Sequence, residues 1–278
     1  MKSIDIQVRG FTFSALSDGP DDGPLLLLLH GLPRTSWEWH HQMPVLASLG
    51  YRVIAPDLRG YCPGARPNNV EAYVIGEFVA DALAIADSLV GSDTAFHLMA
   101  TSIGAKIAWH LAATHPDRVK TLACINIPHP GAFNEVAATA AAEEQRQKMS
   151  YRENSRIEGN ERTTFERSLK RMDLPTEETD PYRVAFGDDE ALRAVYHWYR
   201  AILIDPSRSS HLPAVTMPTL FLWPRGAGNV SRETAAANAN YATGPYRFEV
   251  LENARNFALQ LEPERITELL VEHLAQHG

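Results

Sequence analysis

The chain has 278 residues, of which 45% are hydrophobic and 22% are charged, and its formal net charge is −8. This composition is typical of a globular protein, and the length suffices for one large α/β domain with an insertion or for two small domains. The negative charge argues against nucleic acid or an anionic membrane as the main partner.

The chain also lacks the usual signals for export or membrane insertion. Its apolar run Leu25–Leu29 is far shorter than the ~20 residues that span a bilayer. No basic segment followed by an apolar one opens the sequence, as it would in a secretory signal peptide. We therefore expect a cytoplasmic protein with free thiols at Cys62 and Cys124.

Strand and helix patterns alternate along most of the chain. The first residues alternate apolar and polar side chains around Arg9-Gly10, which predicts a hairpin. Continuous apolar runs follow, and such runs indicate strands that are buried on both faces of a parallel sheet. We predict strands at 25–29, 51–55, 94–99, 121–127, 219–223 and 246–251, and helices at 36–48, 72–90, 103–114 and 262–276. This alternation predicts an α/β fold with a mostly parallel, doubly wound sheet.

One interval interrupts the alternation. Residues 131–212 carry no strand pattern, are rich in Ala, Glu and Arg, and have helical patterns at 133–155, 160–172 and 188–202. We therefore predict a core formed by 1–130 and 213–278, with an all-helical cap inserted between its halves. Such an insertion covers the carboxyl edge of the sheet, where folds of this class bind ligands.

The turn between strand 94–99 and helix 103–114 has the sequence Ala100-Thr101-Ser102-Ile103-Gly104. A serine in a strand–turn–helix context is what a nucleophile elbow of the G-x-S-x-G type requires. Ser102 is therefore the first candidate for a catalytic residue.

Four further motifs complete a resemblance. They are His30-Gly31-Leu32-Pro33, Asp57-Leu58-Arg59-Gly60-Tyr61, His115-Pro116-Asp117-Arg118-Val119 and Leu261-Glu262-Pro263-Glu264-Arg265. With the elbow, they resemble the α/β-hydrolase fold in its epoxide-hydrolase-like branch, whose members carry a helical cap. The resemblance covers nearly the whole chain and is weakest in the cap. It implies that the backbone N–H groups of Leu32 and Ile103 form an oxyanion-type donor pair, with His30 and Thr101 beside the substrate.

The elbow itself departs from the family pattern. Ala100 and Thr101 replace the first two residues of the family's elbow motif, and Ser102 stands where an epoxide hydrolase has its aspartate nucleophile. A serine without a neighbouring base is a weak nucleophile.

The acid and the base of the family are also missing from their usual positions. The family's acid follows the strand 219–223, but residues 224–230 contain no carboxylate and the nearest acid is Glu233. The family's base precedes the last helix, where this chain has Asn256. An asparagine does not take up and return a proton at neutral pH. The sequence thus predicts a degenerate triad, in which Ser102 and Asn256 position the substrate by hydrogen bonds.

Two tyrosines of the cap indicate a different chemistry. The segment His197-Trp198-Tyr199-Arg200 resembles the Asn-Trp-Tyr-Arg segment of epoxide hydrolases, whose tyrosine donates a hydrogen bond to the epoxide oxygen. Tyr151 falls where the branch carries its second such tyrosine. The resemblance implies catalytic roles for Tyr199 and Tyr151, with Trp198 and His197 beside the substrate. The alternative is that these aromatic side chains only pack the cap against the core.

Three functions fit these features. The leading interpretation is a cofactor-independent enzyme of specialised metabolism in which a hydrophobic, polycyclic substrate opens its own epoxide by cyclisation, or isomerises. The alternative is a hydrolase whose Ser102 is activated by a relocated histidine, such as His129 or His197, or by chemistry at Cys62, a further candidate for substrate positioning. The third is a non-catalytic binder of a small molecule.

Cofactors and assembly are the remaining questions. The histidines, including the adjacent pair His40-His41, show no metal-ligand spacing, and no glycine-rich phosphate loop is present. We therefore expect neither a metal nor another cofactor. The oligomeric state stays open, a homodimer being one option.

Overall fold

The computed structural model describes residues 1–208 and 211–278, so the predicted cap interval 131–212 is covered except for positions 209–210, which lie outside the described residues. An eight-stranded sheet in the order β1-β2-β4-β3-β5-β6-β7-β8 forms the centre. β1 and β2 form the predicted hairpin, β2 pairs with β4 in antiparallel fashion, and the remaining pairs are parallel. The strands are β1 (Lys2–Val8), β2 (Phe11–Asp18), β3 (Leu25–Leu29), β4 (Arg52–Pro56), β5 (Phe96–Thr101), β6 (Val119–Ile125), β7 (Thr219–Pro224) and β8 (Tyr246–Leu251).

Helices cover both faces of the sheet, as the apolar strands require. One face packs against α2 (Ile75–Val90) and α3 (Ile103–Thr114), and the other against α1 (Gln42–Ser48) and α12 (Pro263–His277). All five leucines of β3 are buried because both faces of that strand are covered. The shorter elements are η1 (Ser36–Trp39), η2 (Pro63–Ala65), η3 (Val70–Tyr73), η4 (Pro116–Arg118), η5 (Pro206–Arg208), α10 (Arg232–Ala237), η6 (Asn238–Tyr241) and α11 (Ala258–Leu261).

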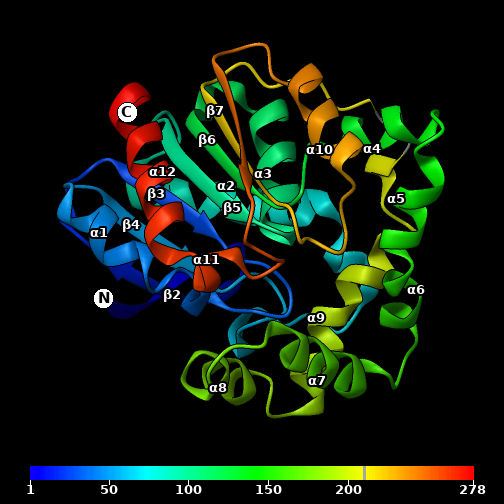
Figure 1. Ribbon diagram of the computed structural model, residues 1–278. Coiled ribbons are helices and arrows are strands. Elements are labelled where there is room, and N and C mark those ends of the chain that lie inside the picture. The colour runs from blue at the N-terminus through cyan, green and yellow to red at the C-terminus, as the bar shows by residue number, and fades with distance from the viewer. Residues whose placement is uncertain (209–210) are drawn as a thin grey trace.

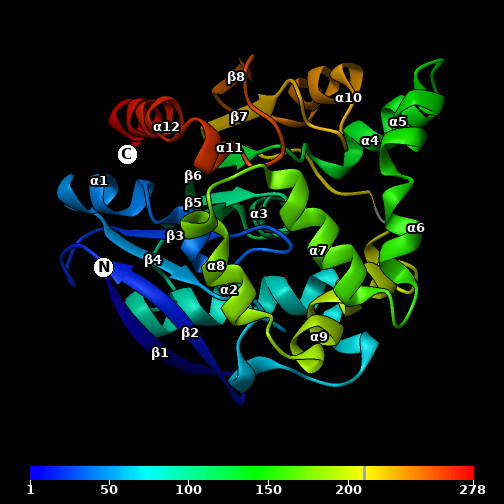
Figure 2. The ribbon, with the colours of Figure 1, turned by 60° about the horizontal axis from the view of Figure 1, so that its bottom comes forward.

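A helical insertion, α4–α9, separates β6 from β7, which confirms the predicted fold class. In Figure 1, α7, α8 and α9 lie together below the sheet, and α4, α5 and α6 run along one side of it. In Figure 2, which brings that end forward, α7 and α8 lie in front of the strands. The helices are α4 (Pro130–Ala137), α5 (Ala142–Met149), α6 (Tyr151–Arg156), α7 (Glu161–Met172), α8 (Thr176–Ala185) and α9 (Asp189–Ala201).

The insertion contains more helices than the sequence predicted. The single helix expected at 133–155 is three helices with two interruptions. At the first, the Thr139 hydroxyl accepts the N–H of Ala141 (3.2 Å), and at the second, the Ser150 hydroxyl donates to the Gln147 carbonyl (2.8 Å). Helix α8 was not predicted at all. It contains Pro181 in its interior, and proline argues against a helix because it lacks a backbone N–H and clashes with the preceding turn. Within the described residues, no helix is both long and apolar enough to cross a membrane.

Candidate functional site

A cavity of about 710 Å³ lies between the carboxyl ends of the parallel strands and the cap. Its core wall includes Leu32 after β3, Ser102 after β5, Asn126 after β6 and Gly226 after β7. Its cap wall comes from α6, α7 and α9. The carboxyl edge of a parallel sheet is where loops from several strands converge, so this position is the expected one for a ligand site.

Ser102 occupies a nucleophile elbow. Its φ is +53° and its ψ is −118°, a strained conformation for a residue with a Cβ. The turn is held by hydrogen bonds from the Ser102 N–H to the Ile125 carbonyl (3.2 Å) and from the Gly104 N–H to the His30 carbonyl (3.1 Å). Gly104 is required because a Cβ there would lie 2.4 Å from the carbonyl oxygen of Leu29.

Two backbone amides beside Ser102 are available to a ligand. Leu32 lines the main cavity, and Ile103 lines a small extension of about 40 Å³ next to Ser102. Among the described residues, neither amide N–H has an acceptor. Free amides at this position fit the donor pair that the sequence predicted.

Three asparagines, Asn126, Asn229 and Asn256, line the cavity together with Ser102. Asn256 lines the cavity, and its Oδ1 accepts the N–H of Gly228 at 3.2 Å. The Oδ1 atoms of Asn126 and Asn229 are buried in the cavity wall and have no partner in the described protein. The described residues of this wall include no histidine, and Glu153 is their one carboxylate.

His30 stabilises the loop after β3 and does not reach the cavity. The Leu58 N–H donates to Nε2 (2.9 Å), so the ring proton is on Nδ1, which donates to the Gly31 carbonyl (2.9 Å). Complete burial lowers the pKa of His30 to about 3, and the ring is neutral. Thr101 is likewise buried at the end of β5 and does not line the cavity. Neither residue therefore lies where the resemblance placed it.

The proposed substitute bases are also engaged elsewhere. His129 accepts the Gly131 N–H at Nδ1 (3.0 Å) and has its Nε2 3.1 Å from the carbonyl oxygen of Pro213. His197 packs against Tyr73, and its Nδ1 faces Arg200 at 3.3 Å. Burial lowers both pKa values, that of His129 to about 4. Neither ring lines the cavity, so neither can take a proton from Ser102.

Cys62 and Glu233 also lie outside the cavity wall. Cys62 is buried, with its Sγ 3.6 Å from the Thr12 carbonyl oxygen, and it does not line the cavity. Burial raises the pKa of its thiol to about 11, the opposite of what a nucleophilic cysteine needs. Glu233 is exposed in the first turn of α10, outside the cavity wall.

Three tyrosines form the cap wall opposite Ser102. Tyr151 begins α6, and Tyr196 and Tyr199 lie one turn apart on α9. The ring centroid of Tyr199 lies 6.2 Å from that of Tyr151 and 5.9 Å from that of Tyr196. Burial, together with the neighbouring phenols, raises the pKa of Tyr199 well above its usual value, so it stays protonated and can donate.

Tyr196 was missed by the sequence reasoning, although its spacing of three from Tyr199 places both on one helix face. Its hydroxyl is buried and has no partner among the described residues. Trp198 lines only the small extension, where the Lys106 ammonium lies 5.0 Å above its ring.

Arg34 is a second residue that the sequence reasoning missed. It is fully buried, and its Nε lies 2.7 Å from Oε1 of Glu38. Its Nη1 donates to the Asn256 carbonyl (3.3 Å), and its guanidinium lies 5.0 Å above the ring of Phe257. Glu38 Oε2 in turn accepts the Gly31 N–H at 2.7 Å. The available signal was the i, i+4 spacing of an arginine and a glutamate directly after the first motif.

Comparison with known proteins agrees with this geometry. Residues 24–226 match the model of the alpha/beta hydrolase fold family. The chain belongs to the α/β-hydrolase family. It is 30% identical to human epoxide hydrolase 4 over 284 residues, covering 96% of this chain and 76% of the relative. It is also 29% identical to the AB hydrolase superfamily protein YfhM of Bacillus subtilis, covering 97% of this chain and 96% of the relative.

Solved structures of α/β hydrolases share the fold. An epoxide hydrolase from metagenomes of hot environments aligns with a TM-score of 0.87 at 24% identity, covering 99% of both chains. The chain is thus an epoxide-hydrolase-like α/β hydrolase in sequence and in architecture.

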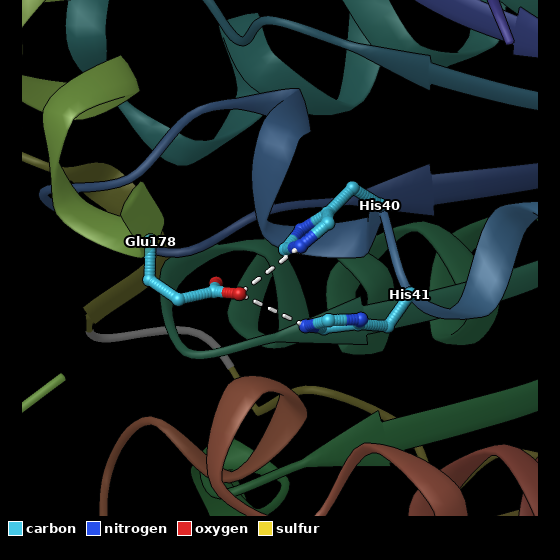
Figure 3. Close-up of side chains that lie close together, drawn as sticks. All are labelled: His40, His41 and Glu178. Atoms are coloured by element: carbon cyan, nitrogen blue, oxygen red, sulfur yellow. Dashed lines mark hydrogen bonds and ion pairs between the residues drawn. The ribbon is translucent and has the colours of Figure 1, made fainter. Parts of the chain in front are cut away.

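A polar cluster outside the cavity corrects one expectation about the histidines. His40 and His41 precede α1, and Glu178 comes from α8 of the cap (Figure 3). Glu178 Oε1 lies 3.3 Å from Nε2 of His40 and 3.1 Å from Nε2 of His41. The adjacent histidines do converge on a carboxylate, because the third group comes from a distant helix that the sequence did not predict.

Proposed function

We propose that this chain opens the epoxide ring of a small molecule held between the elbow and the cap. The main observation in support is that Tyr151 and Tyr199 line the same cavity as Ser102. Phenols at this position donate hydrogen bonds to the epoxide oxygen and stabilise the alkoxide as the C–O bond breaks. The family membership and the names of the relatives support this chemistry.

The nucleophile, we propose further, belongs to the substrate. No histidine lies in the described cavity wall to activate Ser102 or a water molecule. In the proposed reaction, a nucleophilic group of the substrate forms a bond to one epoxide carbon while the C–O bond at that carbon breaks. The proton of the nucleophile passes overall to the epoxide oxygen, so the product is a cyclised isomer. Holding the two ends together contributes up to about 7–11 kcal/mol to such a step.

Hydrolysis is the second candidate, and the relatives favour it because several are named epoxide hydrolases. In that reaction water attacks the epoxide carbon, and the product is a diol. The tyrosines have the same role in both reactions. The two differ only in the source of the nucleophile.

An aryl epoxide that carries an internal hydroxyl group separates the two candidates. We expect incubation in oxygen-18 water to yield a cyclic ether without the label. A labelled polyol would instead establish hydrolysis, and recovery of unchanged epoxide after tight binding would indicate a non-catalytic binder.

Variants then test the residues. We expect Tyr199→Phe to lower kcat/KM by roughly 10²–10⁴-fold, the usual contribution of a general acid. Tyr241→Phe is the matched control, because Tyr241 stacks on His129 outside the cavity. Ser102→Ala should cost only about 10-fold, the value of one hydrogen bond. A complete loss of activity in Ser102→Ala, with covalent labelling of Ser102 by a fluorophosphonate, would show that the serine is a nucleophile after all.

A further inference from the structure

The wall of the cavity carries the opposite charge to the protein as a whole. The chain has 34 acidic and 26 basic residues, not counting histidine. The described residues that line the main cavity and its extension nevertheless include one acid, Glu153, and six basic residues: Arg34, Lys106, Arg152, Arg167, Arg171 and Arg255. A concave site lined by one sign of charge concentrates ligands of the opposite sign.

Arg34 supplies the deepest of these charges. Its Nη2 is buried and has no hydrogen-bond partner within the described chain, whereas its other nitrogens face Glu38 and Asn256. A Cβ placed on Gly31 would lie 1.8 Å from this Nη2 and 2.7 Å from the Cβ of Ser102. The unpartnered N–H groups therefore lie beside the elbow. A buried donor without an acceptor is costly, which is why such a group in a cavity wall points to a ligand.

The outer part of the cavity wall also carries more basic than acidic side chains. Arg167 and Arg171 lie one turn apart on α7, and neither forms an ion pair within the described residues. Arg255 has only a long contact, 3.5 Å, to Asp173. Four other arginines of the cap do form ion pairs, as Arg183 does with Glu166 at 2.7 Å. The cavity wall thus includes two cap arginines, Arg167 and Arg171, whose charge no acid of the described residues balances.

We infer that the ligand of this cavity carries an oxyanion, such as a carboxylate, sulfate or phosphate, which binds Arg34 beside Ser102. Guanidinium groups suit these anions because their N–H groups match the geometry of paired oxygens. The inference rests on the proposal that the cavity is the substrate site, and it changes the expected substrate from purely hydrophobic to amphiphilic. The anion then binds the core wall, and the epoxide oxygen binds the tyrosines of the cap wall.

A matched pair of probes tests this without any turnover. The probes are 2-naphthoate and its neutral amide, 2-naphthamide, with binding measured by calorimetry. We expect naphthoate to bind at least about 10-fold more tightly, since one charge-assisted hydrogen bond accounts for that ratio. Added salt should weaken naphthoate binding and leave naphthamide binding unchanged. Inorganic phosphate and sulfate, titrated as competitors, indicate which oxyanion the site prefers.

Arginine variants show which side chains cause the preference for naphthoate. Arg167→Gln with Arg171→Gln should reduce the preference for naphthoate several-fold, whereas Lys170→Gln should not. Lys170 is exposed on the same helix and does not line the cavity, so it controls for the lost charge. The double variant Arg34→Met/Glu38→Gln should abolish the preference while keeping the buried pair neutral. Equal binding of the two probes to the wild-type protein would overturn the inference.

The outcomes also separate this inference from the proposed function. Tight, Arg34-dependent binding of naphthoate without turnover of any epoxide would refute the proposed reaction only. Turnover of neutral epoxides with no preference for anionic ones would refute the anion site only.

A second inference concerns the cluster of His40, His41 and Glu178, and it is independent of the cavity. His40 Nδ1 lies 2.7 Å from the carbonyl oxygen of Trp37, so Nδ1 carries the proton and Nε2 is a bare acceptor. That Nε2 faces Glu178 Oε1, a second acceptor, at 3.3 Å. The other carboxylate oxygen, Oε2, is buried without a partner in the described chain. Two facing acceptors repel each other unless a proton or a metal ion lies between them.

We propose that these three side chains bind Zn²⁺ and thereby connect the cap to the core. All their ligand atoms lie within 4.8 Å of one another. Zinc bonds of about 2.0–2.1 Å in tetrahedral geometry separate ligand atoms by roughly 3.3 Å, close to the two distances observed here. The bond from His40 Nδ1 to Trp37 fixes the ring in the metal-binding orientation. None of the three residues lines the cavity, so the ion would connect the cap to the core, with a water molecule as its fourth ligand.

Thermal unfolding with added ZnCl2 tests this site. At zinc concentrations about 100-fold above Kd, we expect the Tm of the full chain to rise by roughly 5 °C, and excess chelator should reverse the rise. Glu178→Gln and His41→Gln should remove the response, whereas Glu177→Gln, a substitution of the neighbouring acid on α8, should keep it. An unchanged Tm in the wild-type protein, or an equal rise in Glu178→Gln, would refute the zinc site.

Discussion

The buried pair of Arg34 and Glu38 gives the sharpest test of how the site is built. Both side chains are at most 2% exposed, and their charged atoms lie 2.7 Å apart. Glu38 also accepts the Gly31 N–H at 2.7 Å, and so holds the loop that carries Leu32. Removing either partner therefore leaves an uncompensated charge next to the elbow.

The two single variants should differ because only one of the charges can be neutralised. Glu38→Gln leaves a guanidinium that cannot lose its proton, and breaking a buried pair in this way costs about 3–5 kcal/mol. Arg34→Met leaves a carboxylate whose pKa burial already raises and which the arginine normally opposes. It can take up a proton instead, so we expect a smaller loss of about 2–3 kcal/mol. The double variant, with no buried charge, should lose only about 1 kcal/mol.

Urea unfolding of the four proteins, followed by circular dichroism, measures this cycle. The loss in free energy of unfolding should be larger in each single variant than in the double variant, giving a coupling of several kcal/mol between the two sites. Because the pKa of Glu38 is raised in the folded state, the deficit of Arg34→Met should shrink as the pH is lowered towards the unfolded value of 4.5. Strictly additive losses would refute the reasoning, since they would mean that neither charge depends on the other.

Three further outcomes follow from the structure. Burial lowers the pKa of His30 to about 3 and that of four other histidines to about 4, so the unfolded state binds more protons below pH 6.5. The free energy of unfolding should therefore fall by up to about 1.4 kcal/mol per histidine for each pH unit below 6.5. Urea titrations at several pH values measure this, and a free energy of unfolding that does not change with pH would contradict it. Gly104→Ala should destabilise the fold by at least about 1–3 kcal/mol, because its Cβ would lie 2.4 Å from a backbone oxygen; Gly76→Ala, in open space on α2, should be stabilising. Since the described cavity wall contains no histidine, kcat/KM should stay level between about pH 6 and 8, and a bell-shaped profile there would reveal an overlooked base.

Much of the fold was predictable because its signals are local. The run Leu25–Leu29 is a strand buried on both faces, as its composition indicates, and the elbow at Ser102 lies between a strand and a helix as its motif requires. The resemblance also placed Tyr151 and Tyr199 in one cavity with Ser102. Each of these depends on a short segment and on its position along the chain.

The roles of polar residues near the motifs were less predictable, because a sequence does not show which of their donors and acceptors already bind other groups of the protein. His30 and Cys62 are the clearest cases, since their polar atoms bind backbone groups away from the cavity. Arg34 shows the reverse case. Its i, i+4 partner suggests an ordinary surface pair, whereas contacts with Asn256 and Phe257, far along the chain, help to bury it. The cluster at His40 was hidden for the same reason, since Glu178 lies 137 residues from His41.

These placements suggest a role for the strained elbow beside a cavity whose described wall contains no histidine. Beside Ser102, the amides of Leu32 and Ile103 have no acceptor within the described residues, and Nη2 of Arg34 lies near the same turn. Strain at such a position persists when the surrounding structure gains from it. A hydrolase gains a nucleophile, but in this chain the gain we propose is a set of N–H donors that converge on one point. On that reading the elbow binds an anion rather than attacking a carbon, and substitutions that flatten it should weaken naphthoate binding even where Ser102→Ala does not.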